Sequence, residues 1–309
     1  MCMRTADSKP DRTKSDCAGA IVCAFAAAVL YALSSPVSKY LLRFSSPTMM
    51  AAFLYLGAGT GIGILSVIRR DKRRTAGRLG RKDLPYVIGM IVLDIIAPVL
   101  LMRGLLLTNA STASMLNNFE IVATSLIALI VFRERISIRL WCGIAAVTIA
   151  SILLSVTDFT SLQLSSGSLL ILGACVCWGL ENNCTRMISD RDTYEIVFIK
   201  GICSGAGSLV IALSIGDKVP DLLCVLVTLL LGFTAYGLSI FFYIRAQKVI
   251  GAAKTSAYYA SSPFIGAFFS VLFLKETLDI PAVIGFLIMI PGTILVISDT
   301  MRNTREKSV

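Results

Sequence analysis

Three carboxylic acids interrupt runs of otherwise apolar residues: Asp94, Glu120 and Glu181. A charged side chain near the middle of a membrane helix costs about 2.5–3.5 kcal/mol on insertion scales. Each acid should therefore face a partner, an aqueous cavity or a bound ligand. The chemistry open to it is attraction of a cationic or zwitterionic solute, or uptake of a proton, because burial favours the neutral form of a carboxyl group. The alternative is a paired, inert acid that links two helices.

Spacing singles out Glu120. Asn117, Glu120 and Thr124 lie at i, i+3 and i+7, on one face of a helix. We expect this face to line a substrate cavity, where Glu120 binds a proton or an amine and Asn117 and Ser262 supply hydrogen bonds. The positions 142 residues further on carry Tyr259, Ser262 and Gly266.

The other acids have less support. For Asp94, the sequence supports a binding role and a structural role equally. Glu181 precedes Arg186 by five residues, close enough for a structural ion pair. Lys200 is interpreted as snorkelling to the membrane surface, with contact to a substrate carboxylate as the alternative.

Aromatic side chains form a second class of candidates. Trp178 and Tyr259 could hold an apolar or cationic part of a substrate, although aromatic residues also fill helix bundles. None of the acids is duplicated across the repeat: Ser262 stands for Glu120, Tyr236 for Asp94 and Ser34 for Glu181. The predicted cavity is therefore acidic on one side.

Several kinds of chemistry are not expected. The chain has no histidine, which excludes a His-liganded metal and a His general base. It has no Gly-x-x-x-x-Gly-Lys-[Ser/Thr] motif for ATP, and its nine cysteines show no metal spacing. We therefore predict no metal, no cofactor and no catalytic residue. The alternatives to a carrier of small solutes are an integral-membrane enzyme acting on a lipid-linked substrate and a passive channel.

The elements that position these residues must be membrane helices. Hydrophobic residues make up 56% of the 309 residues. Unpaired backbone cannot lie in lipid, so these apolar stretches are helices. The pairs Gly57-x-x-x-Gly61 and Gly201-x-x-x-Gly205 are interpreted as packing faces. Ten segments are long enough to cross about 30 Å of hydrocarbon: 18–42, 47–68, 85–106, 110–132, 138–157, 168–188, 193–215, 221–244, 252–274 and 279–298.

The chain repeats itself. Arg103, Ser114, Glu134 and Gly143 recur 142 residues later as Arg245, Ser256, Glu276 and Gly285. The fold class is all-α integral membrane, with ten transmembrane helices as two inverted five-helix repeats, because an odd number of helices turns the second copy over. The predicted parts are a cytoplasmic tail 1–17, a first repeat 18–157, an external linker 158–167, a second repeat 168–298 and a cytoplasmic tail 299–309.

The basic residues give the orientation. With both termini in the cytoplasm, most of the 29 Lys and Arg residues fall on the inner side. The net charge of +10 therefore indicates membrane orientation and not nucleic-acid binding. The basic loop 69–82 has lipid headgroup contact as an alternative role. Segment 18–42 follows a basic stretch as a secretory signal would, but its counterpart 168–188 lies in mid-chain, so we expect a retained helix.

The chain resembles the EamA-type, ten-helix members of the drug/metabolite transporter superfamily. The likeness rests on residues 111–114 and 117–120, on the charged turn 132–135, and on Gly143. In the second copy it rests on 255–257, Pro263, 274–276 and Gly285. Ile121 stands where many relatives have a proline, which leaves open whether the fourth helix kinks as the ninth should.

The resemblance implies a transporter of amino acids, amines or other metabolites. We expect a secondary active transporter that moves a small metabolite, with export favoured, across the plasma (inner) membrane by alternating access. Protons or solute exchange would drive it. Its partners are the small-molecule substrate and the lipid bilayer, and a homodimer is left open.

Overall fold

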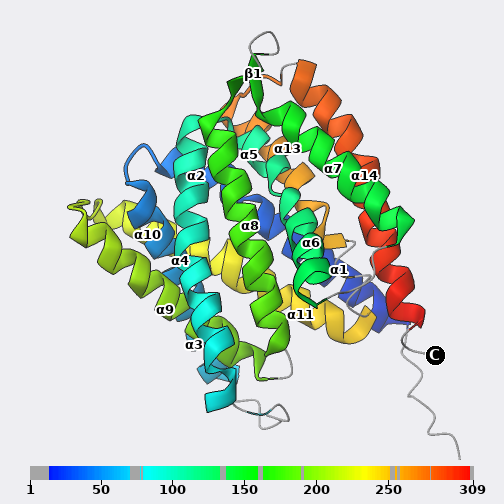
Figure 1. The fold of residues 1–309 in the computed structure, drawn as a ribbon. Helices are drawn as coiled ribbons and strands as arrows, with labels where there is room; N and C mark the ends of the chain where they lie inside the picture. The colour runs from blue at the N-terminus through cyan, green and yellow to red at the C-terminus, as the bar shows by residue number, and fades with distance from the viewer. Residues whose placement is uncertain are drawn as a thin grey trace, which may run out of the picture.

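The computed structural model describes residues 14–69, 77, 79–132, 137–158, 163–188, 191–250, 255, 258–278 and 280–306. Residues 1–13 of the predicted tail 1–17, residues 133–136, and residues 70–76 and 78 of the basic loop 69–82 lie outside the described residues. Nearly everything described is helical (Figure 1). The first half contains α1 (Lys14–Ala32), α2 (Ser34–Leu41), α3 (Pro47–Arg69), the short η1 (Arg81–Asp83), α4 (Leu84–Leu107), α5 (Ala110–Leu116), α6 (Phe119–Phe132) and α7 (Ile138–Ser155).

The second half begins after a short antiparallel hairpin, which is an exception to the expected all-α structure. Its strands are β1 (Val156–Asp158) and β2 (Gln163–Leu164), and they lie at one end of the bundle (Figure 1). The helices that follow are α8 (Ser166–Met187), α9 (Thr193–Ser214), α10 (Leu222–Leu231), the π-helix η2 (Gly232–Leu238), α11 (Ser239–Ile250), α13 (Ser262–Leu274) and α14 (Ile280–Glu306).

The lengths of the apolar helices indicate a multi-pass membrane protein. Three shorter apolar helices accompany the long ones: Ile138–Leu154, Ser262–Leu274 and Ile280–Leu295. Helix α8 is long enough to cross but carries Glu181, Asn182 and Asn183, which lower its hydropathy. Five described stretches are long and apolar enough to cross a membrane: Ala18–Leu41, Pro47–Ile68, Arg81–Leu107, Tyr194–Ser214 and Leu222–Tyr243.

The major helix contacts join the two halves of the chain. Helix α3 packs on α9, α4 on α8, α7 on α14, α1 on α11 and α5 on α13. Exchanging the halves turns α1 with α11 into α8 with α4, and it maps α3 with α9 and α7 with α14 onto themselves. Neither half therefore buries its apolar faces alone.

Glycines let α3 and α9 approach closely. A Cβ atom on Gly201 would lie 2.5 Å from the Cα atom of Gly59, and one on Gly205 would lie 2.6 Å from the backbone nitrogen of Leu56. A side chain at Gly57 would collide with the backbone of Leu229. The interpretation of these glycines as packing faces is confirmed, since any larger residue would separate the helices.

The fourth helix does break, although it lacks the proline. A turn at Asn117 and Asn118 separates α5 from α6. The amide of Asn118 donates to the carbonyl of Met115 at 3.3 Å, which is the kind of side-chain bond that competes with helix. In the second half a turn at Ala260 and Ser261 precedes α13. Given the 142-residue offset, the two breaks fall at equivalent positions.

Candidate functional site

Lys200 joins two of the three acids inside the bundle. Its Nζ atom lies 3.1 Å from Asp94 Oδ2 and 3.1 Å from Glu181 Oε1. Asp94 comes from α4, Glu181 from α8 and Lys200 from α9, and the two acids are 0% and 1% exposed. The snorkelling interpretation of Lys200 is wrong, because two buried carboxylates offset the cost of desolvating its ammonium group. Glu181 pairs with Lys200; the side chain of Arg186, the partner that the sequence suggested, is not among those that the structure describes.

Hydrogen bonds hold these two carboxylates in place. The Tyr55 hydroxyl donates to Asp94 Oδ1 at 2.9 Å, and the indole N–H of Trp178 donates to that hydroxyl at 3.3 Å. The Thr185 hydroxyl donates to Glu181 Oε1. Trp178 thus belongs to the same network as Asp94 and Glu181, where it orients Tyr55.

Glu120 lies beside this network but is bound differently. It stands in the first turn of α6, directly after the break, and is partly exposed. The Asn182 amide donates to Glu120 Oε1 at 2.7 Å and contacts Thr124 Oγ1 at 3.3 Å. Within the described part of the chain Glu120 forms no ion pair, although Glu181 and Lys200 lie within electrostatic range of it. Of the three acids, Glu120 is therefore the one that pairs with no cation in the described part of the chain.

Polar atoms near the two breaks have no partner among the described residues. They are Asn117 Oδ1, Asn118 Oδ1, Ser114 Oγ and Ser262 Oγ, all on buried residues. A Cβ atom on Gly266 would lie 2.9 Å from Ser114 Oγ, so α5 and α13 meet here. Buried polar atoms are nearly always hydrogen-bonded to protein, water or ligand. Asn117 and Ser262 thus keep capacity to bind a ligand, as their predicted role requires.

A chain of tyrosine rings adjoins Glu120. Tyr31 lies 5.7 Å from both Tyr236 and Tyr259, measured between ring centroids. The rings of Tyr31, Tyr236 and Tyr259 lie within electrostatic range of the Glu120 carboxylate. Tyr55 extends the chain from Tyr236 at 5.7 Å, and Tyr243 extends it from Tyr259 at 5.2 Å. The tyrosines connect the Glu120 region to the Asp94 network.

The structure thus places the predicted residues in two adjoining groups. Asp94 and Glu181 pair with Lys200, and Trp178 joins them through Tyr55. Tyr259 belongs to the tyrosine chain near Glu120. Sequence reasoning missed Tyr55, Asn182 and Thr185. A signal for two of these was present, because Trp178, Glu181, Asn182 and Thr185 lie at i, i+3, i+4 and i+7, on one face of α8.

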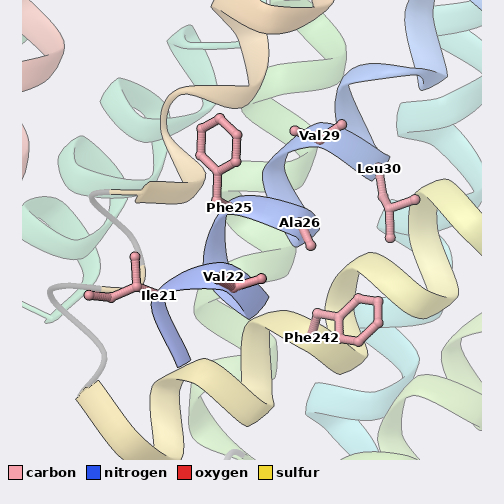
Figure 2. Close-up of a pocket in the computed structure, with 7 residues that line it drawn as sticks. All are labelled: Ile21, Val22, Phe25, Ala26, Val29, Leu30 and Phe242. Atoms are coloured by element: carbon pink, nitrogen blue, oxygen red, sulfur yellow. The ribbon is translucent and has the colours of Figure 1, made fainter. Parts of the chain in front are cut away.

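An apolar pocket on α1 is not part of this site. Figure 2 shows it lined by α1 side chains and by Phe242 of α11. Val22 and Phe25 on its rim are 67% and 50% exposed. A binding site for a metabolite needs a few placed polar groups to orient the ligand, and this pocket has only apolar lining residues. The lining residues are Ile21, Val22, Phe25, Ala26, Val29, Leu30 and Phe242.

The model of one family matches both halves of the chain. It is described as the EamA-like transporter family, and it matches residues 18–156 and 165–298. The chain belongs to the EamA-like transporter family. The resemblance inferred from the sequence is thereby confirmed, and so is the twofold repeat of one unit. As an EamA-like transporter the protein is grouped with membrane transporters, and the geometry above describes the interior of such a bundle.

Relatives of this EamA-like transporter are known by sequence and by structure. An uncharacterized transporter from Methanothermobacter thermautotrophicus is 26% identical over 87% of this chain and 83% of its own length. The uncharacterized transporter YyaM from Bacillus subtilis is 23% identical over 88% of this chain and 92% of its own. A protein of known crystal structure, 14% identical, matches 89% of the chain with a TM-score of 0.64 and shares the fold.

Proposed function

We propose that this protein is a secondary active transporter that exports a small metabolite across the plasma membrane by alternating access. The observation that carries the proposal is the position of Glu120. Its carboxylate stands at the break between α5 and α6, held by Asn182 and adjoined by tyrosines, with no ion pair to any described residue. Broken helices near the middle of a bundle are a common place for substrate and ion sites in transporters.

The proposed topology has ten spans in two inverted repeats. The repeats are 18–157 and 168–298, joined outside the cell by 158–167, with the tails 1–17 and 299–309 in the cytoplasm. Support comes from those helix pairs between the halves that exchange of the halves preserves. The distribution of Lys and Arg supports the orientation.

In the proposed mechanism, one of the two gates is closed in this conformation. Glu276, after α13, accepts hydrogen bonds from the backbone N–H groups of Ala110 and Ser111, at the start of α5. The Ser46 hydroxyl donates to Asp217 at 2.5 Å, linking the start of α3 to the end of α9. The proposed topology puts both contacts on the outer side. The equivalent inner turn at 133–136 lies outside the described residues.

In the proposed mechanism the two halves rock about the central site. Glu120 binds either the substrate or a proton, so that loading with one releases the other. Asn117 and Ser262 give hydrogen bonds to the substrate, and Tyr259 packs against it. Asp94, Glu181 and Trp178 hold Lys200 and Tyr55 beside it. Helices α7 and α14 pack on each other and act as scaffold.

The test begins with binding. Detergent-purified protein is screened by thermal stability against amines, amino acids, nucleosides and organic acids at two pH values. A ligand at 100 times its Kd should stabilise by about 2.7 kcal/mol. Each hit is then tested for uptake into proteoliposomes with and without a pH gradient. We expect saturable transport that Glu120→Gln abolishes and that Glu195→Gln, at the start of α9 and outside the cavity, leaves intact.

Other results would contradict the proposal. Flux that does not saturate would indicate a channel. Conversion of a solute to a product would indicate an enzyme. Transport that keeps its rate and pH dependence in Glu120→Gln would remove Glu120 from the mechanism.

A further inference from the structure

We propose that the transported solute is an organic amine with an apolar or aromatic body and no carboxylate. This rests on the proposed function and narrows its substrate class. The inference comes from the charges, the unpartnered atoms and the rings that the fold gathers around Glu120.

Charge balance calls for a cation. The buried region contains the carboxylates of Asp94, Glu120 and Glu181, and among the described side chains Lys200 is the cation that lies between them. Its single ammonium group is shared by Asp94 and Glu181, so these three groups, all ionised, carry a net charge of −1. Glu120 adds a second negative charge. Uncompensated charge inside a membrane bundle is costly, and a bound ammonium group or a proton on Glu120 would offset it.

The same arrangement disfavours a carboxylate on the solute. An amino acid or organic acid would need a cation, and Lys200 already lies 3.1 Å from two carboxylates. A substrate carboxylate would have to displace Asp94 or Glu181 from Lys200. It would also add a further negative charge to a region that already holds three acids, and like charges at short range repel. The site should therefore reject zwitterions as well as anions.

An unpartnered acceptor supports an N–H donor as ligand. Asn117 Oδ1 is buried and has no hydrogen-bond partner among the residues that the structure describes. The backbone N–H of Glu120 donates to the Asn117 carbonyl at 3.1 Å, so the two residues stand together at the break. An ammonium group has three N–H donors and no acceptor. It can therefore donate hydrogen bonds to the Glu120 carboxylate and to the side-chain Oδ1 atom of Asn117 together.

The tyrosine rings suit the rest of such a molecule. Tyr31, Tyr236 and Tyr259 lie within electrostatic range of Glu120, and the Tyr31 ring centroid is 5.7 Å from each of the other two. The face of a tyrosine ring attracts a cation and packs well against an apolar body. The Tyr236 hydroxyl is hydrogen-bonded to Ser34 Oγ at 3.0 Å, which fixes the ring's orientation. An amine can therefore place its body along the rings and its ammonium group at Glu120.

Matched ligands test the proposal. Binding of 2-phenylethylamine, phenylalanine and 3-phenylpropionate to the purified full-length protein is measured by calorimetry at one neutral pH. The three share the aromatic body and differ in their charged groups. We expect 2-phenylethylamine to bind at least tenfold more tightly than either carboxylate. Glu120→Gln should weaken the amine at least tenfold, Glu120→Asp less, and the matched control Glu195→Gln not at all.

A second pair of variants examines the rings. Tyr31→Leu and Tyr259→Leu should each weaken 2-phenylethylamine several-fold, whereas Tyr258→Leu, at a 37% exposed neighbour, should not. Melting curves of every variant show whether it is folded. If Glu120→Gln does not fold, Glu120→Asp and the ring variants carry the test.

Two outcomes would overturn the amine assignment. One is phenylalanine or 3-phenylpropionate binding as tightly as the amine. The other is amine affinity that Glu120→Gln leaves unchanged. If no amine binds but another solute from the broad screen is transported saturably, the substrate class is wrong and the proposed function stands. If no solute in the screen is transported, the proposed function itself fails.

Discussion

Ser111 and Glu276 are joined by two hydrogen bonds to one oxygen atom. Glu276 Oε2 accepts from the Ser111 backbone N–H at 2.9 Å and from its hydroxyl at 2.7 Å, while Oε1 accepts from the Ala110 N–H at 2.7 Å. The first N–H groups of a helix have no partner within it, and a carboxylate there is also favoured by the helix dipole. Glu276 thus caps α5 from the other half of the chain.

Replacing this cap should loosen the contact between α5 and α13. We expect Glu276→Ala to lower the free energy of unfolding by about 1–3 kcal/mol, since hydrogen bonds to a charged group are lost and N–H groups are left unpaired. Thermal melts in detergent measure the change. Thr277→Ala, at the next and exposed position, is the control. Equal melting temperatures for the two variants would show that the cap contributes nothing.

Removing Lys200 should be more damaging. Lys200→Met leaves Asp94 and Glu181 buried without their cation, and breaking a buried ion pair typically costs about 3–5 kcal/mol. Adding Asp94→Asn and Glu181→Gln to Lys200→Met should recover much of the loss, because no buried charge then lacks a partner. A mutant cycle on the unfolding free energy measures this coupling. Strictly additive effects would contradict the ion-paired arrangement.

A second ion pair offers a contrast in burial. Arg191 Nε lies 3.0 Å from Asp83 Oδ2, but the Arg191 side chain is 38% exposed. Exposed ion pairs contribute about 0.2–1 kcal/mol and are screened by salt. Arg191→Ala should therefore cost less than about 1 kcal/mol, with the difference shrinking at high salt. A loss of stability as large as that of Lys200→Met would show that burial does not determine how much each ion pair contributes.

The approach of α3 and α9 should be intolerant of side chains. Gly201→Val would force the helices apart at Gly59, and overpacking of this kind costs about 1–3 kcal/mol. Gly19→Ala is the control, because a Cβ atom at Gly19 meets nothing within 4 Å and alanine favours helix. Melting temperatures give the comparison. Gly201→Val should also slow transport, because Lys200 precedes it on the same helix.

The sequence was sufficient to identify the helices, the repeat and the three acids. Long apolar runs must form helices in lipid, so the pattern of hydropathy along the chain predicts the helices and their approximate ends. An acid in such a run stands out because it is costly there. The same reasoning singled out Glu120 before any contact was known. The break of the fourth helix was left open, because it depends on Asn117 and Asn118 and not on a proline.

Only the tertiary structure decided which groups meet. Asp94 and Lys200 are 106 residues apart, on helices whose neighbours depend on how the two halves pack. A local pattern can place Glu181 near Arg186 but holds no information on a cation from another helix. The free energy of a buried charge depends on its neighbours in space. For that reason Lys200 was expected at the membrane surface and is found among the acids, and for that reason Asn182 was missed.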